Sequence, residues 1–99
     1  MAPKSHQGGG GDSGCRVVQL QREALEDLQY RVEHDRKVAK RVLELIESAR
    51  RTPYEGIGKP EPLRHLGSDV WSRRITKADR LVYRVLGSSI DVLQARFHY

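Results

Sequence analysis

The sequence has little of what builds disulfide bonds, zinc sites or membrane spans. Among 99 residues there is one cysteine, Cys15, so no internal disulfide can form and a reducing compartment is expected. The four histidines have no cysteine partners at ligand spacing, so we expect neither a metal site nor a cofactor. No apolar run approaches the length of a membrane span, and the N-terminus lacks the apolar core of a signal peptide. We therefore expect a soluble, cytoplasmic protein.

Acidic residues are scarce in the C-terminal part of the chain. Residues 64–99 hold seven Lys and Arg against three Asp, a net charge of +4 out of +5 for the whole chain. The sequence pI is about 9.7. A basic half joined to a nearly neutral remainder suits nucleic acid or an acidic protein segment as a partner. On charge alone, a solvated cationic surface is an equally good interpretation.

The first residues of the chain are rich in glycine and poor in apolar side chains. Four consecutive glycines occupy positions 8–11, and such a segment cannot offset the entropy lost on ordering. We predict a disordered tail over residues 1–15. The length of the remainder predicts one domain with a modest core over residues 16–99.

The domain is predicted to begin with a strand and a helix. Residues 16–20 are typical of a short strand. Over residues 21–33, Leu25, Leu28 and Val32 recur at i, i+3 and i+7, which predicts a helix with this stripe facing the core.

A second helix is predicted directly after the first. Asp35 is a residue type favoured as an N-cap, and Pro53 forbids continuation of the helix beyond Arg51. Two helices so close in sequence predict an αα-hairpin. The core-facing stripe of the second helix comprises Val38, Val42, Leu45, Ile46 and Ala49.

Residues 52–62 are predicted to form a loop. Two glycines and three prolines in eleven residues oppose regular structure. Glu61 stands between Pro60 and Pro62, and the following proline restricts it to an extended conformation. The sequence therefore predicts a stiff mount for a carboxylate.

The pattern after this loop alternates, which predicts strands over residues 70–75, 80–86 and 90–99. One predicted face carries Trp71, Ile75, Leu81, Tyr83, Val85, Leu93, Ala95 and Phe97, with Arg73 as a polar exception. The other carries Ser72, Arg74, Arg80, Arg84, Gln94, Arg96 and His98, with Val82, Ile90 and Val92 as apolar exceptions.

The last two strands are predicted to form a hairpin. A three-residue loop over Gly87–Ser89 places Arg80 opposite Arg96, with His98 one diagonal away. A different register would move this pairing.

Glu61, the arginines and His98 are the parts needed to cleave RNA without a metal. A carboxylate can accept the proton of a ribose 2′-OH, and arginines can stabilise the charge that develops on the phosphate. An imidazolium can protonate the departing 5′ oxygen, which gives a 2′,3′-cyclic phosphate and a 5′-hydroxyl. From the pattern alone, a simple nucleic-acid-binding face is the stronger interpretation.

Four stretches together resemble the YoeB branch of the RelE toxin superfamily. They are RTPYEGIGKPEPLRH at 51–65, WSRRI at 71–75, RLVY at 80–83 and RFHY at 96–99. The resemblance implies an α+β fold of the RelE type. In this fold an N-terminal strand and a two-helix hairpin pack on a twisted, mainly antiparallel sheet of four to five strands.

The resemblance also implies a ribosome-dependent mRNA endonuclease, the toxin of a type II toxin–antitoxin pair, which cuts mRNA in the ribosomal A site. By motif position, Glu61 is the general base, Arg80 the phosphate and transition-state stabiliser, and His98 the general acid. Tyr99 helps to form the site at the C-terminus. Basic side chains are expected to hold the RNA backbone or ribosomal RNA: Lys59, Arg64, His65, Arg73, Arg74 and Arg96.

The implied partners are the ribosome, mRNA and a YefM-type antitoxin whose acidic segment wraps the toxin, and a homodimer is common in this branch. The chain departs from the usual pattern at three informative positions. Asp79 replaces a His beside Arg80, Arg31 replaces a Trp in the first helix, and Phe97 replaces a Tyr. A buried carboxylate beside Arg80 would compete with phosphate, whereas an exposed one would change little.

Two functions from other classes stay open. One is a non-catalytic protein of the same fold that binds the ribosome or the antitoxin, and the other is a gyrase inhibitor of the ParE type. Glu61 and His98 separate the nuclease from both, because binding alone needs neither a base nor an acid.

Overall fold

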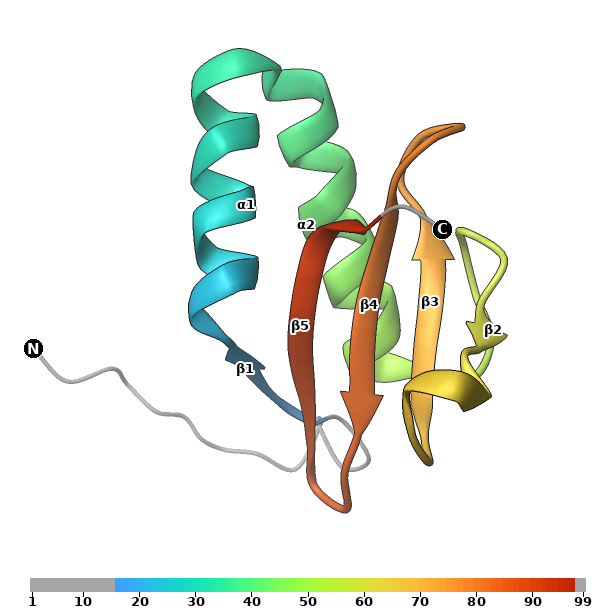
Figure 1. The fold of residues 1–99 in the computed structure, drawn as a ribbon. Helices are drawn as coiled ribbons and strands as arrows, with labels where there is room; N and C mark the ends of the chain where they lie inside the picture. The colour runs from blue at the N-terminus through green and yellow to red at the C-terminus, as the bar shows by residue number, and fades with distance from the viewer. Residues whose placement is uncertain (1–15, 98–99) are drawn as a thin grey trace, which may run out of the picture.

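The computed structural model describes residues 16–97, so the predicted tail over residues 1–15 and the predicted site residues His98 and Tyr99 lie outside the described residues. Two helices pack against one face of a five-stranded sheet (Figure 1), which confirms the predicted α+β fold. Along the chain the elements are β1 (Val17–Leu20), α1 (Arg22–His34), α2 (Arg36–Arg51), β2 (Glu61–Pro62), the short 3-10 helix η3 (Arg64–Leu66), β3 (Val70–Arg74), β4 (Arg80–Val85) and β5 (Ser89–Phe97).

The sheet has the strand order β1-β5-β4-β3-β2 and is mainly antiparallel, as predicted. Only the pair of β1 and β5 is parallel among the described strands. At the opposite edge, β2 consists of Glu61 and Pro62 alone. The predicted loop therefore ends in a short strand, and its proline is tolerated because an edge strand pairs on one side only.

Helix α2 follows the prediction closely. The side chain of Asp35 accepts a hydrogen bond of 3.2 Å from the main-chain nitrogen of Val38, so Asp35 is the N-cap. Of the predicted stripe, all members except the half-buried Val38 are buried.

Helix α1 presents a different face to the core from the one predicted. Its buried residues are Ala24 and Arg31, whereas Leu25 is 45% and Val32 is 47% exposed. Of the predicted stripe, Leu28 alone packs against the core. The side of α1 that faces the sheet instead carries Asp27 and Arg31, which hydrogen-bond to the main chain of Ala95 on β5.

The main core lies between the helices and the sheet and includes Leu45, Leu81, Tyr83, Ile90 and Val92. A smaller cluster lies on the opposite side of the sheet from the helices, and we call that side the outer face. This outer cluster comprises Leu63, Val70 and Val82, with Leu93 and Phe97 packed against it.

Neither helix of the described part is long and apolar enough to cross a membrane.

The register of the hairpin of β4 and β5 differs from the predicted one. Tyr83 lies opposite Val92 and Arg80 lies opposite Phe97, so three steps along β4 match five along β5. The pairing is already one residue off next to the turn, because Val85 lies opposite Ile90 and Leu86 hydrogen-bonds to Ser89 across two residues instead of the predicted three. The predicted pairing of Arg80 with Arg96 is therefore wrong.

The shorter turn exchanges the predicted faces at the start of β5, whereas Ala95, beyond the irregularities, lies in the main core as predicted. Ile90 and Val92 belong to the main core, whereas Leu93 and Phe97 lie with the outer cluster. Alternation within each strand does not give the number of residues in the turn, and that number sets which face of the second strand meets the core.

Candidate active site

The outer face brings predicted site residues from neighbouring strands together. Glu61 of β2 lies opposite Ser72 of β3, and Arg74 of β3 lies opposite Arg80 of β4. Arg80 lies in turn opposite Phe97 of β5, the last described residue. Four consecutive strands thus contribute to one small area.

Glu61 and Arg80, the predicted base and phosphate ligand, form an ion pair. Oε1 of Glu61 lies 3.5 Å from Nη1 of Arg80, and their side chains are 50% and 15% exposed. The carboxylate is therefore open to a ligand, while the guanidinium is held largely within the protein. A phosphodiester bound here would meet a proton acceptor and a positive charge side by side.

Arg74 adds a second cation next to Arg80. Directly opposed residues of antiparallel strands have Cβ atoms about 5 Å apart, and like charges at that spacing destabilise the sheet. The side chain of Arg74 is exposed and that of Arg80 is half-buried. The repulsion between these two cations destabilises the fold, and a bound anion such as a phosphate would reduce that repulsion.

The predicted RNA-binding residues closest to Glu61 in sequence are all exposed. Lys59 lies two residues before Glu61 and has a positive φ of 53°. Arg64 and His65 belong to η3, which Leu63 alone separates from β2. An open hollow of about 540 Å³ adjoins this segment, with Pro62, Arg64 and Trp71 in its lining. It has room for a group of the size of a nucleobase.

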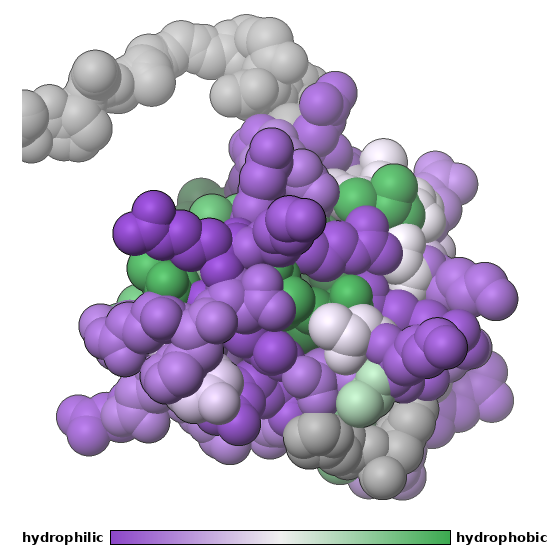
Figure 2. Space-filling model, turned by 90° about the horizontal axis from the view of Figure 1, so that it is seen from above, coloured by the Kyte–Doolittle hydropathy of each residue, from purple (hydrophilic) through white to green (hydrophobic). Residues whose placement is uncertain are grey.

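Arg74 and Arg80 lie where β3 ends and β4 begins. Figure 2 views the molecule from this end and shows a mostly hydrophilic surface, with hydrophobic side chains visible only between hydrophilic ones. A polar surface of this kind suits a charged ligand better than an apolar one.

Arg96 does not lie on the face of Arg80. Its guanidinium carbon is 3.8 Å from the ring centroid of Tyr30 on α1, and that ring stacks on His34 at 4.0 Å. The irregular register puts Phe97 opposite Arg80 instead. A contact of Arg96 with RNA stays a prediction, but it would be made away from Glu61.

Arg73 cannot contact RNA, so that prediction is wrong. Its exposure is 0%, and its side chain points to the helix side of the sheet. The guanidinium lies 5.6 Å from the ring centroid of Tyr83 and donates a hydrogen bond of 2.9 Å to the hydroxyl of that residue. Alternation had already marked Arg73 as the one polar member of an apolar face.

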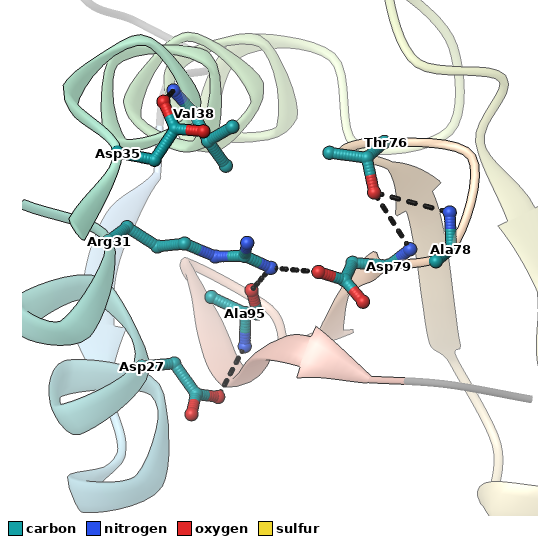
Figure 3. A network of polar contacts seen from close by, with 8 residues as sticks. All are labelled: Asp27, Arg31, Asp35, Val38, Thr76, Ala78, Asp79 and Ala95. Atoms are coloured by element: carbon teal, nitrogen blue, oxygen red, sulfur yellow. Dashed lines mark hydrogen bonds and ion pairs between the residues drawn. The ribbon is translucent and has the colours of Figure 1, made fainter.

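Asp79 forms a buried ion pair with Arg31 of α1 (Figure 3). Arg31 also donates to the carbonyl of Ala95 at 3.2 Å, while the amide of Ala95 donates to the carboxylate of Asp27 at 2.9 Å. The hydroxyl of Thr76 accepts from the amide of Asp79 at 3.0 Å. The network therefore joins α1 to β5 and to the turn before Arg80.

Tyr83 is a residue of the site region whose importance the sequence analysis missed. Its hydroxyl donates to the carbonyl of Pro53 at 2.6 Å and accepts from Arg73. Burial raises the pKa of the Tyr83 phenol above its usual value of 10, against the opposing effect of the Arg73 hydrogen bond. The available signal was the RLVY motif at residues 80–83, which contains Tyr83.

Comparison with known proteins gives a consistent result. Residues 20–99 match the family model described as the YoeB-like toxin of bacterial type II toxin–antitoxin systems. Toxin YoeB of Escherichia coli K12 is 49% identical over 77 residues, which cover 78% of this chain and 92% of that protein.

Two solved structures from Staphylococcus aureus are also similar. A YoeB dimer has a TM-score of 0.79 at 36% identity, with 85% of this chain and 98% of that chain covered. A heterotetrameric YoeB–YefM toxin–antitoxin complex has a TM-score of 0.75 at 37% identity, with the same coverage of 85% and 98%.

Proposed function

This chain belongs to the YoeB-like toxins of bacterial type II toxin–antitoxin systems, and we propose that it acts as a ribosome-dependent endoribonuclease that cleaves mRNA in the ribosomal A site. The observation that carries the proposal is the 3.5 Å approach of Glu61 to Arg80 on the open outer face. A protein that only binds RNA does not need a half-exposed carboxylate beside its phosphate-binding cation.

The reaction is a transfer of the phosphorus from the 5′ oxygen to the 2′ oxygen. Glu61 accepts the proton of the 2′-OH as this oxygen attacks the phosphorus. Arg80, with Arg74 beside it, stabilises the added negative charge on the phosphate oxygens. The bond from phosphorus to the 5′ oxygen breaks, and His98 protonates that oxygen. The products are a 2′,3′-cyclic phosphate and a 5′-hydroxyl.

The remaining predicted residues have supporting roles in this proposal. Tyr99 helps to form the site at the C-terminus, and Lys59, Arg64 and His65 hold the RNA backbone or ribosomal RNA. The Glu61 side chain is 50% exposed on an open face, and in this proposal the ribosome supplies much of the alignment of the mRNA.

A YefM-type antitoxin is the proposed protein partner, by analogy with the heterotetrameric complex from Staphylococcus aureus. The excess of positive charge in residues 64–99 suits an acidic antitoxin segment. A homodimer is proposed on the same basis, since the related Staphylococcus aureus toxin has been solved as a dimer.

Primer extension on an mRNA in a translating bacterial extract tests the activity. We expect in-frame cuts with wild type, none with Glu61→Gln or His98→Ala, and none on naked RNA. Stalled translation without cuts by wild type would favour a non-catalytic ribosome binder. An effect on DNA supercoiling without any effect on translation would favour a gyrase inhibitor.

A further inference from the structure

Arg73 is buried, and its guanidinium uses every N–H group that it has. An arginine side chain has five such donors in a fixed fork. The acceptors are the hydroxyls of Tyr83 (2.9 Å from Nε) and Ser48 (2.7 Å from Nη1), and the carbonyls of Ile57 (3.1 Å from Nη1), Thr52 (2.7 Å from Nη2) and Glu55 (2.7 Å from Nη2).

All five acceptors are neutral oxygens, so none of these hydrogen bonds neutralises the charge. A buried cation is costly unless its donors are satisfied. Loss of these hydrogen bonds would leave the charge without solvation in the low-dielectric interior. The arrangement is therefore rigid, because each lost acceptor weakens the solvation of the whole guanidinium.

Three of the five acceptors are main-chain carbonyls of one loop, residues 52–60, which wraps around the guanidinium. A Cβ added at Gly56 would lie 2.5 Å from Ser48 Oγ and 3.2 Å from Arg73 Nη1, so the loop packs too closely against Ser48, one of the acceptors of Arg73, for a side chain there. The carbonyl of Gly58 accepts from the amide of Arg74 at 2.7 Å. The side chain of Arg73 and the amide of Arg74 thus fix the loop along its length.

This loop leads directly into Glu61. The strand that carries Glu61 has two residues, and Pro62 has no N–H to contribute to the ladder. So short a strand has few hydrogen bonds of its own to fix its position. The place of Glu61 relative to Arg80 therefore depends on the loop before it.

We propose that Arg73 is a positioning residue, which organises residues 52–60 around its guanidinium and thereby holds Glu61 at the distance from Arg80 that proton abstraction needs. The proposal rests on the proposed nuclease function. It assigns a role in the reaction to a residue that cannot touch RNA.

The test compares Ser48→Ala, which removes one acceptor from Nη1, with Arg73→Lys, which replaces the guanidinium and its five donors by an ammonium group. Cleavage by purified protein is measured on programmed ribosomes over a range of ribosome concentrations. Displacement of a catalytic group by about 1 Å can cost about a hundredfold in rate. We expect the rate at saturation to fall roughly tenfold for Ser48→Ala and about a hundredfold for Arg73→Lys, with the half-saturating ribosome concentration unchanged.

Ser88→Ala is the matched control, because Ser88 is exposed in the hairpin of β4 and β5 and undergoes the same chemical change. Hydrogen exchange of the amides of residues 54–59 reports on the loop directly and should speed up in Ser48→Ala but not in Ser88→Ala. A simple loss of folded protein would lower the rate in proportion to the folded fraction, which circular dichroism measures.

A second comparison repeats both substitutions in a Glu61→Gln background, whose slow residual cleavage, too slow for primer extension in the extract, is measured with purified protein over long incubations. If Arg73 acts through Glu61, neither substitution should lower the residual rate further. Full additivity, or unchanged rates and exchange in Ser48→Ala, would overturn the proposal even if Arg73→Lys failed to fold. Absence of cleavage by wild type would instead contradict the nuclease function, while the hydrogen-exchange comparison would still decide the role of Arg73 in the loop.

Discussion

Arg31 and Asp79 lie 48 positions apart in the sequence and form an ion pair in which their side chains are 9% and 13% exposed. Both residues stand where the resemblance leads us to expect other residue types, and the structure brings the two together. The carboxylate of Asp79 is directed toward α1, while Arg80 approaches Glu61 on the outer face. The carboxylate of Asp79 therefore pairs with Arg31 and does not occupy the position of a phosphate beside Arg80.

The Arg31–Asp79 pair should contribute strongly to stability. Asp79→Asn leaves the buried Arg31 guanidinium without its counter-charge, and we expect a loss on the order of 3 kcal/mol in the free energy of unfolding. Urea denaturation followed by circular dichroism measures this loss. Glu47→Gln is the control, because the exposed Glu47–Arg50 pair should contribute less than about 1 kcal/mol. Equal effects of the two substitutions would contradict a structural role for the buried pair.

Arg74 should matter more for cleavage than Arg96. Arg74→Gln removes the cation beside Arg80, whereas Arg96→Gln removes one stacked on Tyr30. Both change the net charge equally, so any difference reflects position. We expect a loss of tenfold or more in cleavage rate for Arg74→Gln, and a smaller loss for Arg96→Gln, in the primer-extension assay. A larger loss of cleavage rate for Arg96→Gln than for Arg74→Gln would indicate that the phosphate binds closer to α1.

Tyr83 should make stability dependent on alkaline pH. Its pKa is raised in the folded state, so the neutral phenol is favoured there. This contribution is complete below about pH 10, the usual tyrosine value, and is lost as the pH rises toward the folded-state pKa. The stability difference between wild type and Tyr83→Phe should shrink from neutral pH to about pH 11 in urea titrations. A constant difference over that range would show that Tyr83 does not titrate differently in the two states.

Gly58 should tolerate no side chain. Its φ is +86°, and an added Cβ would lie 2.6 Å from Cδ2 of the fully buried Leu45. Gly58→Ala should cost about 1–3 kcal/mol and lower cleavage, because the loop before Glu61 must shift. Gly87→Ala is the control, since nothing lies within 4 Å of a Cβ there. Thermal melts of both variants check the cost, and equal melting temperatures would mean that the loop absorbs the change freely.

The sequence by itself determined the order and type of nearly all elements, and the reason is that these signals are local. The N-cap of α2 at Asp35 and the apolar stripe of this helix depend only on residues close together in the sequence. The four toxin motifs likewise identified the family, because each is a contiguous run. The extended conformation of Glu61 also followed locally, from the proline after it.

Only the tertiary structure decided where the side chains of the site meet. A two-residue turn and two extra residues in β5 together put Phe97 rather than Arg96 opposite Arg80, and alternation gives neither the turn length nor the irregular register. The burial of Arg73 required a loop twenty residues upstream to supply its acceptors. Such contacts join residues that are distant in the chain, and their energies depend on geometry that no local pattern encodes.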